Sequence, residues 1–220
     1  MIYPEFFPKD REGEHAEKKV YDALKTVADR YDIFYSRKFV EAGEGRKPEY
    51  EIDFIIAIPD QAILCLEVKG GAVNYDGMSD RWTQNSKAMD KRPDSQASAA
   101  SHALTRRFSD EVSQMPVGWG LCFPDCQIQH DVPFPSSIDC NQVIDEASLL
   151  HIDSALPGIF DFLKRQNPGR SGARHWQYSK LKQHLLRGLG FVQLLGTRIK
   201  YQEKRFVELT GQQLDIFKRI

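Results

Sequence analysis

Hydrophobic residues recur along the chain in two patterns, one with the period of a helix and one with the period of a strand. Over residues 11–30 apolar side chains recur at helical spacing, and Val20, Leu24 and Val27 fall on one stripe. A second helical pattern spans 95–112, where small residues form the apolar face. Strand-like runs occupy 32–40, a hairpin within 51–71, another hairpin ending near Trp82, 116–123 and 141–144.

The order helix, strand, hairpin, helix, strand, strand, helix predicts an α/β domain with a mixed central sheet flanked by helices. Two further helices are expected at 156–166 and 175–190, separated by the Pro/Gly/Ser-rich loop NPGRSG. That loop is the best candidate for a domain edge. We assign residues 1–160 to the α/β domain and residues 161–220, which contain this loop, to a basic helical extension.

Composition indicates an ordinary soluble protein. Of the 220 residues, 41% are hydrophobic and 28% are charged, which lacks the low-hydrophobicity signature of disorder. The first residues show no positively charged leader followed by an apolar core, and no apolar run reaches the length of a membrane-spanning helix. We expect a cytoplasmic protein without a membrane partner.

The cysteines raise the question of zinc. A zinc site could be formed by Cys122, Cys126, His130 and Cys140. The chain has one further cysteine, Cys65. However, the C-x3-C spacing departs from the usual zinc pattern, and Cys122 lies inside an apolar run. The sequence therefore favours free thiols.

Charge is distributed unevenly. Residues 163–205 hold eleven Lys or Arg against one Glu, so this segment is +10 while the whole chain is −1. Such a cluster is typical of nucleic-acid contact, although a solvated basic helix and loop would have the same charge. The candidate DNA-contacting residues are Arg170, Arg174, Lys180, Lys182 and Arg187.

The hairpin within 51–71 contains charges where a core strand should be apolar. A three-residue loop at 59–61 would pair Ile58 with Ala62, and counting back from there places Asp53 directly opposite Glu67. Like charges roughly 5 Å apart destabilise a sheet unless something neutralises them. A divalent cation such as Mg²⁺, which takes oxygen ligands and often only one or two carboxylates, would do so.

Lys69 follows Glu67 on the same strand face, where its ammonium could orient an attacking water or offset developing negative charge. This arrangement suits phosphodiester hydrolysis. Alternatively, Lys69 pairs with Glu51 or Glu67 at an exposed strand end.

The first helix adds another acid. Glu17 lies along the stripe of Val20 and Leu24 and should point toward the sheet, whereas Glu14 points elsewhere. Glu17 is therefore a candidate metal ligand or water-positioning group, with a buried capping or salt-bridge role as the alternative.

These residues resemble a known family. An Asp followed by Glu-x-Lys on adjacent strands, with an upstream helical Glu, is similar to the PD-(D/E)XK nuclease superfamily. More specifically, the chain resembles the nuclease-related domain, NERD, over roughly 13–150. The motifs that carry this resemblance are "EIDFII" with "LEVKGG", "AEKKVYDAL", Asp76-Gly77 before Trp82, "SQA" and "FPD".

The resemblance implies a restriction-endonuclease-like fold and Mg²⁺- or Mn²⁺-dependent cleavage of DNA. The resemblance also implies a role for each site residue. Asp53 and Glu67 would hold the metal, and Lys69 would act on the attacking water. Glu17 would match the helical acid of the family, and Gln96 would reach the site from its helix. Family members often show Gly-Glu at the helical acid, where this chain has Ala16-Glu17 and a displaced Gly13-Glu14, so Glu14 remains an alternative to Glu17.

Two rival interpretations remain open. The first is a non-catalytic DNA-binding or docking module that has kept the nuclease scaffold. The second is an unrelated acidic hairpin in a protein-interaction domain, with the family motifs arising by coincidence.

The last residues, RFVELTGQQLDIFKRI, predict a Thr-capped amphipathic helix. Leu209, Thr210 and Gln213 resemble the "LT-x-x-Q" element that opens superfamily I helicase motors, in which the glutamine contacts adenine. No G-x-x-x-x-G-K-[ST] occurs in the 220 residues, so nucleotide binding would need a downstream motor. We expect a nuclease-helicase polypeptide acting in DNA repair or in defence against foreign DNA.

Overall fold

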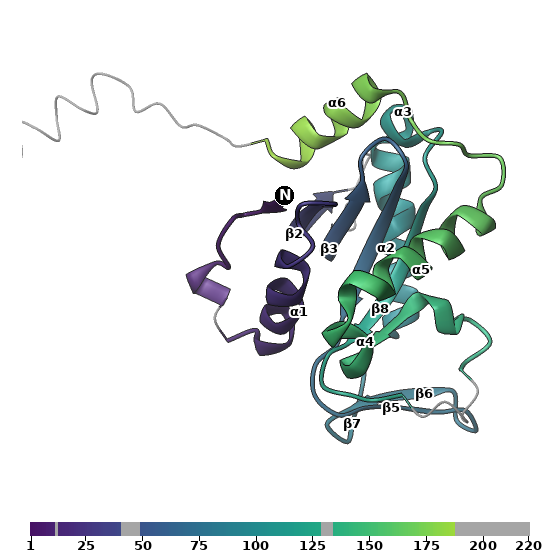
Figure 1. Ribbon diagram of the computed structural model, residues 1–220. Coiled ribbons are helices and arrows are strands. Elements are labelled where there is room, and N and C mark those ends of the chain that lie inside the picture. The colour runs from purple at the N-terminus through teal and green to yellow at the C-terminus, as the bar shows by residue number, and fades with distance from the viewer. Residues whose placement is uncertain (12, 41–48, 129–133, 188–220) are drawn as a thin grey trace, which may run out of the picture. The chain divides into compact units, whose positions relative to one another are not determined.

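The computed structural model describes residues 1–11, 13–40, 49–128 and 134–187 (Figure 1). The chain divides into two compact units, Met1–Leu186 and Arg187–Ile220. Nearly all of the second unit lies outside the described residues, and so does the predicted Leu209–Gln213 element.

A mixed sheet forms the centre of the first unit (Figure 1). Within the described residues it has six strands in the order β1-β2-β3-β4-β8-β9. Strands β2, β3 and β4 are antiparallel neighbours, whereas β1 pairs with β2, β8 with β4 and β9 with β8 in parallel. The strands are β1 (Ile2–Tyr3), β2 (Asp32–Val40), β3 (Glu49–Ile58), β4 (Ala62–Val68), β8 (Val117–Phe123) and β9 (Val143–Asp145).

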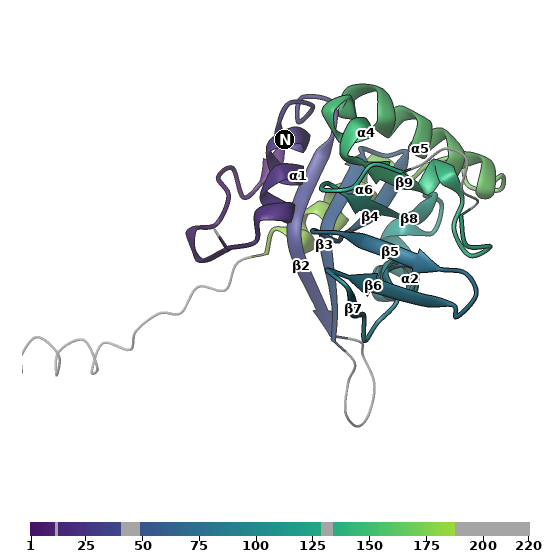
Figure 2. The same cartoon turned by 90° about the horizontal axis from the view of Figure 1, so that it is seen from below.

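Helices cover both faces of this sheet, as the sequence pattern predicts (Figures 1 and 2). Every residue of β4 is buried, which explains its nearly continuous apolar sequence. The helices are η1 (Lys9–Arg11), α1 (His15–Lys25), α2 (Pro93–Arg107), α3 (Ser109–Val112), η2 (Cys140–Gln142), α4 (Glu146–Leu150), α5 (Ile152–Gln166) and α6 (His175–Leu185). None of the helices in the described ranges is long and apolar enough to cross a membrane.

Two apolar cores result from this layering. On one face, α1, α4 and α5 pack against β3 and β4, with Leu24 and Phe160 among the fully buried side chains. On the other face, α2, α3 and α6 contribute Leu104, Val112 and Leu181, which pack with alternate residues of the same strands. The sheet is thus held between two hydrophobic layers.

A second sheet lies next to the main one (Figure 2). It consists of β5 (Val73–Asp76), β6 (Arg81–Gln84) and β7 (Lys87–Ala88), all antiparallel. Trp82 is buried against Phe123 at the end of β8, with ring centroids 6.1 Å apart. The predicted hairpin ending near Trp82 is confirmed, with β7 as an additional strand.

Several predicted helices differ in length from those observed. The pattern over 11–30 yields a helix of only 11 residues, since it begins after Glu14 and is capped at Thr26. The pattern over 95–112 is interrupted at Phe108, whose backbone is not helical, and gives α2 and α3. Side-chain periodicity continues through these breaks, so it did not reveal them.

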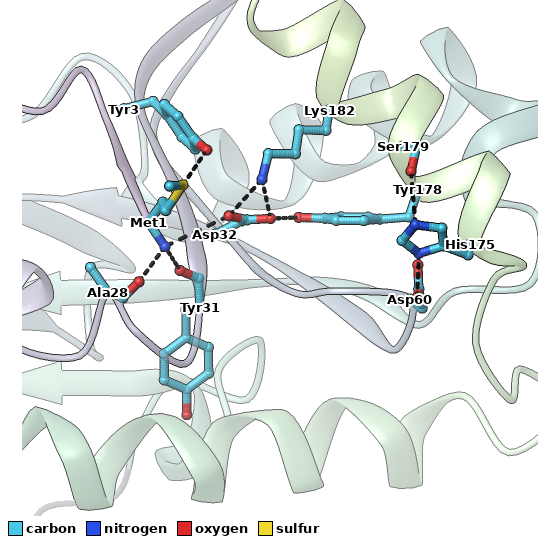
Figure 3. A network of polar contacts seen from close by, with 10 residues as sticks. All are labelled: Met1, Tyr3, Ala28, Tyr31, Asp32, Asp60, His175, Tyr178, Ser179 and Lys182. Carbon is cyan, nitrogen blue, oxygen red and sulfur yellow. Dashed lines mark hydrogen bonds and ion pairs between the residues drawn. The ribbon is translucent and has the colours of Figure 1, made fainter.

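Helix α6 is anchored to the sheet by a polar network (Figure 3). Lys182 donates to both carboxylate oxygens of Asp32 at 2.9 and 2.8 Å, and the Tyr178 hydroxyl donates to the same carboxylate at 2.7 Å. His175 approaches Asp60 at 3.1 Å. The compact unit therefore includes both α5 and α6, and the boundary expected at 160/161 falls inside α5.

Candidate metal and nuclease site

The hairpin of β3 and β4 has the predicted register. Ile58 pairs with Ala62, and the ladder continues to Phe54 opposite Leu66. The next step of the same register brings Asp53 opposite Glu67. Regular pairing stops there, and the Asp53 carboxylate instead accepts a hydrogen bond from the backbone N–H of Val68 at 2.7 Å.

The environment of Asp53 disfavours its negative charge. Burial, the largest cause, and the adjacent Glu67 raise the pKa of Asp53 well above its usual value, and Glu17 acts in the same direction. The Val68 N–H and Lys69 oppose this rise without cancelling it. Two carboxylates are therefore held together without enough positive charge to balance both.

Glu67 and Lys69 form an ion pair at the end of β4. The Lys69 ammonium lies 2.6 Å from a carboxylate oxygen of Glu67, whose side chain is only 6% exposed. The backbone N–H of Lys69 donates to the carbonyl of Cys122 on β8 at 2.9 Å, which holds this strand end in place. The expected pairing of Lys69 with Glu67 thus exists, but in a buried position facing a second acid.

These residues open onto one cavity of about 670 Å³, the site cavity. Asp53, Glu67, Lys69 and Gln96 all line it, although Gln96 comes from the first turn of α2. The structure thus brings together four of the five predicted catalytic residues. The remaining lining residues are Lys38, Glu49, Tyr50, Glu51, Lys91, Arg92, Ser95, Ala99 and Ala100.

The fifth predicted residue, Glu17, lies on α1 outside this lining. It accepts a hydrogen bond from the Tyr35 hydroxyl at 2.5 Å, and Glu14 shares the same hydroxyl at 3.0 Å. Arg11 is 3.1 Å from Glu14 and compensates its charge. Burial and the charge of Glu14 raise the pKa of Glu17 to about 7, despite the opposing hydrogen bond from Tyr35.

The distinction between Glu14 and Glu17 follows from these contacts. The negative charge of Glu17 is among the causes that raise the pKa of Asp53, after burial and Glu67. Glu14 is instead neutralised by Arg11, and its pKa is lowered: burial would raise it, but hydrogen bonds with Glu17, Tyr35 and Arg11 outweigh that effect. The expectation that Glu14 points elsewhere is wrong, because both acids bind the Tyr35 hydroxyl; Glu14 is the N-cap residue before α1, so the helical-face argument does not apply to it.

A close helix-strand approach places α1 beside the site. A Cβ atom at Gly70 would overlap the Cβ of Ala16, so only glycine at position 70 lets this helix come so near. Asp125 joins the two elements, since it pairs with Lys19 of α1 and accepts the N–H of Gly71 at 2.8 Å. Asp125 belongs to the "FPD" motif, and sequence reasoning gave it no role.

The donor set suits one hard cation at most. Among the described residues, no group of three or more His, Cys, Asp or Glu side chains could hold a metal ion. Asp53 and Glu67 supply a carboxylate pair with uncompensated charge, and Mg²⁺ commonly takes only one or two carboxylates from the protein. The residues present therefore fit a divalent metal that keeps water or substrate oxygens as its other ligands.

The alternative zinc site finds no support in the described part of the chain. Cys65 and Cys122 are buried, Cys126 bonds to the carbonyl of Gly71, and Cys140 is exposed; none is in a disulfide. His130 lies outside the described residues.

The five predicted DNA-contacting residues occupy different environments. Lys182 binds Asp32, Lys180 lies 2.7 Å from the buried Glu111, and Arg170 donates to the carbonyl of Met115. Arg174 is exposed at the start of α6. Arg187 begins the second compact unit.

The position of α6 also separates these residues from the site. Asp32, which holds α6, pairs with Ala57 on β3, four residues from Asp53. At about 3.3 Å per residue this corresponds to roughly 13 Å along the strand. Lys182, which binds Asp32, is thus anchored near the end of β3 that leads into the 59–61 loop, away from the acid pair.

Comparison with known protein families gives one result that bears on this geometry. The sequence model of the nuclease-related domain matches residues 12–124, which include α1, the β3–β4 hairpin, Gln96 and β8. Comparisons with curated proteins and with solved structures gave no match. Since the matched range covers half of the chain and contains the whole acid cluster, the chain belongs to the nuclease-related domain family, NERD.

Proposed function

We propose that this chain is a metal-dependent deoxyribonuclease domain that hydrolyses DNA phosphodiester bonds. One observation carries the proposal: Asp53, Glu67, Lys69 and Gln96, from two strands and a helix, line a single open cavity in a member of a nuclease-related family. A folding role alone does not explain why two facing acids should be kept there, because their repulsion is unfavourable.

The metal would be Mg²⁺ or Mn²⁺, held by Asp53 and Glu67. When bound, such an ion lowers the pKa of a coordinated water and screens the negative charge of the phosphate. The raised pKa of Asp53 supports this assignment, because a nearby cation would offset the repulsion that raises it.

The chain's own residues would provide positioning and proton control. Lys69, held by Glu67 at 2.6 Å, would orient the attacking water and stabilise negative charge that develops on the phosphate. The Gln96 amide would bind substrate across the cavity. Glu17 would act as a positioning residue whose charge favours cation binding at Asp53.

The test is a cleavage assay on the purified chain with supercoiled and linear DNA, in Mg²⁺, Mn²⁺ or EDTA. We expect cleavage only with metal, and its loss in Asp53→Asn and Glu67→Gln. Asp22→Asn is the matched control, because Asp22 is an exposed acid on α1 that pairs with Lys18. Metal-independent DNA binding without cleavage in any form would instead favour the non-catalytic docking module.

The proposal extends to a helicase partner in the same polypeptide, acting in the cytoplasm in DNA repair or in defence against foreign DNA. Its support is the resemblance of Leu209, Thr210 and Gln213 to the first element of a helicase motor. The sequence encoded beyond Ile220 tests it. A phosphate-binding loop shortly downstream would support the proposal, and an immediate stop codon would contradict it.

A further inference from the structure

A second cavity adjoins the site cavity. It measures about 530 Å³ and shares Lys69, Lys91 and Gln96 with the site cavity, so the two lie side by side, and we call them together the groove. The second cavity extends the groove past the β6–β7 turn. Its other lining residues are Gln84, Asn85, Lys87, Ala88, Met89 and Asp90.

The groove has unbalanced positive charge at this end. Lys87 and Lys91 are both exposed, and within the described part of the chain neither forms an ion pair. The second cavity contains one acid, Asp90, against three lysines. By contrast, Lys69 is paired with Glu67, and Lys180 and Lys182 on α6 are paired with Glu111 and Asp32.

The segment that carries Lys87 and Lys91 is fixed relative to the catalytic strand. The Gln84 amide donates to the carbonyl of Gly70 at 2.7 Å, directly after Lys69. On the other side of the two lysines, Arg92 bridges Asp80 and Asp94 at 2.6 and 3.1 Å.

We propose that this groove is the path of the DNA strand, in which Lys87 and Lys91 bind backbone phosphates beside the scissile bond. The inference rests on the proposed function and adds the residues that position its substrate. Lys87 and Lys91 line the same cavity as Lys69 and have exposed ammonium groups of the kind that bind phosphates of a nucleic-acid backbone.

The test measures DNA binding and cleavage separately for Lys87→Ala/Lys91→Ala in the 220-residue chain. Binding of fluorescein-labelled DNA is measured in EDTA at several salt concentrations, and cleavage in Mg²⁺ or Mn²⁺. Loss of two phosphate contacts should flatten the slope of log affinity against log salt by about 1.4 to 1.8 and raise KM more than it lowers kcat. The matched control is Lys9→Ala/Arg107→Ala, which removes two exposed charges outside both cavities.

The outcomes distinguish this proposal from the proposed function. If the wild type cleaves DNA and the double variant matches the control in affinity and slope, the groove proposal is overturned and the nuclease proposal stands. If the wild type binds without cleaving and the double variant loses affinity, the groove is supported and catalysis is not. If the wild type neither binds DNA in EDTA nor cleaves it with metal, both proposals are overturned.

Discussion

Asp32 and Asp53 are carboxylates on adjacent strands of one sheet, yet their surroundings differ in the number of hydrogen-bond donors. Asp32 receives three hydrogen bonds from Lys182 and Tyr178 (Figure 3). Burial alone would raise its pKa, but these partners lower it below the usual value. Asp53 receives one backbone hydrogen bond and faces Glu67, and its pKa is raised.

The difference separates a structural acid, Asp32, from Asp53, which we propose to be a metal ligand. The chain itself neutralises Asp32, so this residue joins α6 to the sheet and has no need of an external partner. Asp53 and Glu67 have one ammonium between them, that of Lys69, and they open onto a cavity. A group whose charge the protein leaves unbalanced beside a cavity is where a ligand of opposite charge gains most.

The largest expected effect comes from removing one of the facing acids. Asp53→Asn or Glu67→Gln should lower DNA cleavage by about 10²–10³-fold or more, because one of the two proposed metal ligands is lost. Without metal, the free energy of unfolding should hold or rise, since the repulsion between the two side chains is gone. Cleavage rates and urea unfolding in EDTA measure the two effects; a strongly destabilised variant would contradict the comparison.

Removing the partner of the structural acid Asp32 should lower the stability of the fold and leave DNA cleavage unchanged. Lys182→Ala leaves Asp32 buried with fewer donors and should reduce the free energy of unfolding by about 2 kcal/mol. Cleavage per folded molecule should not change, because α6 lies roughly 13 Å along β3 from Asp53. Chemical denaturation and activity assays below the unfolding transition check this; a specific loss of cleavage would show that α6 belongs to the site.

The free energy of unfolding should depend on pH in opposite directions for the two kinds of acid, Glu17 and Asp53 on one side and Asp32 on the other. Glu17 and Asp53 have pKa values above their unfolded values, so the stability they contribute is present at low pH and is lost as pH rises, around pH 7 for Glu17. Asp32 has a lowered pKa, so its contribution is present above roughly pH 4 and is lost on acidification.

Unfolding free energies measured in EDTA from about pH 4 to pH 9 test these signs. Relative to wild type, Glu17→Gln should gain on the order of 1 kcal/mol between pH 6 and 8, an amount reduced by the partial exposure of Glu17. Asp32→Asn should lose stability most at neutral pH and least in acid. Parallel pH profiles for both variants would disprove the contrast.

The smallest expected effect concerns the predicted DNA contacts on the basic extension. Arg174 is exposed, whereas Lys180, Lys182 and Arg170 have partners in the protein. If Arg174 binds a phosphate, Arg174→Ala should flatten the slope of log affinity against log salt by about 0.9. Titrations of labelled DNA measure this slope, with Lys9→Ala as the control. If the slopes of Arg174→Ala and Lys9→Ala both equal that of the wild type, Arg174 belongs to a solvated surface.

Sequence alone predicted what is local in this fold. The length of the 59–61 loop fixed the pairing of Ile58 with Ala62, and strand alternation then placed Asp53 against Glu67. Gln96 was predicted only through resemblance to a family, because a first-turn glutamine carries no signal of its own.

Contacts between distant segments could not be predicted. Lys182 and Asp32 are 150 residues apart in sequence, so the charge pattern gave no sign that this lysine is an anchor for α6. The same holds for Asp125, which joins α1 to the end of β4, and for Lys87 and Lys91, whose position beside Lys69 depends on how the small sheet packs.

The most direct test of the central claim is a crystal of the chain soaked in Mn²⁺, with anomalous diffraction used to locate the ion. The carboxylate pair should bind Mn²⁺, so we expect an anomalous peak between Asp53 and Glu67, and its absence in Asp53→Asn. A peak elsewhere, or no peak between these two acids in an otherwise well-ordered site, would contradict the account.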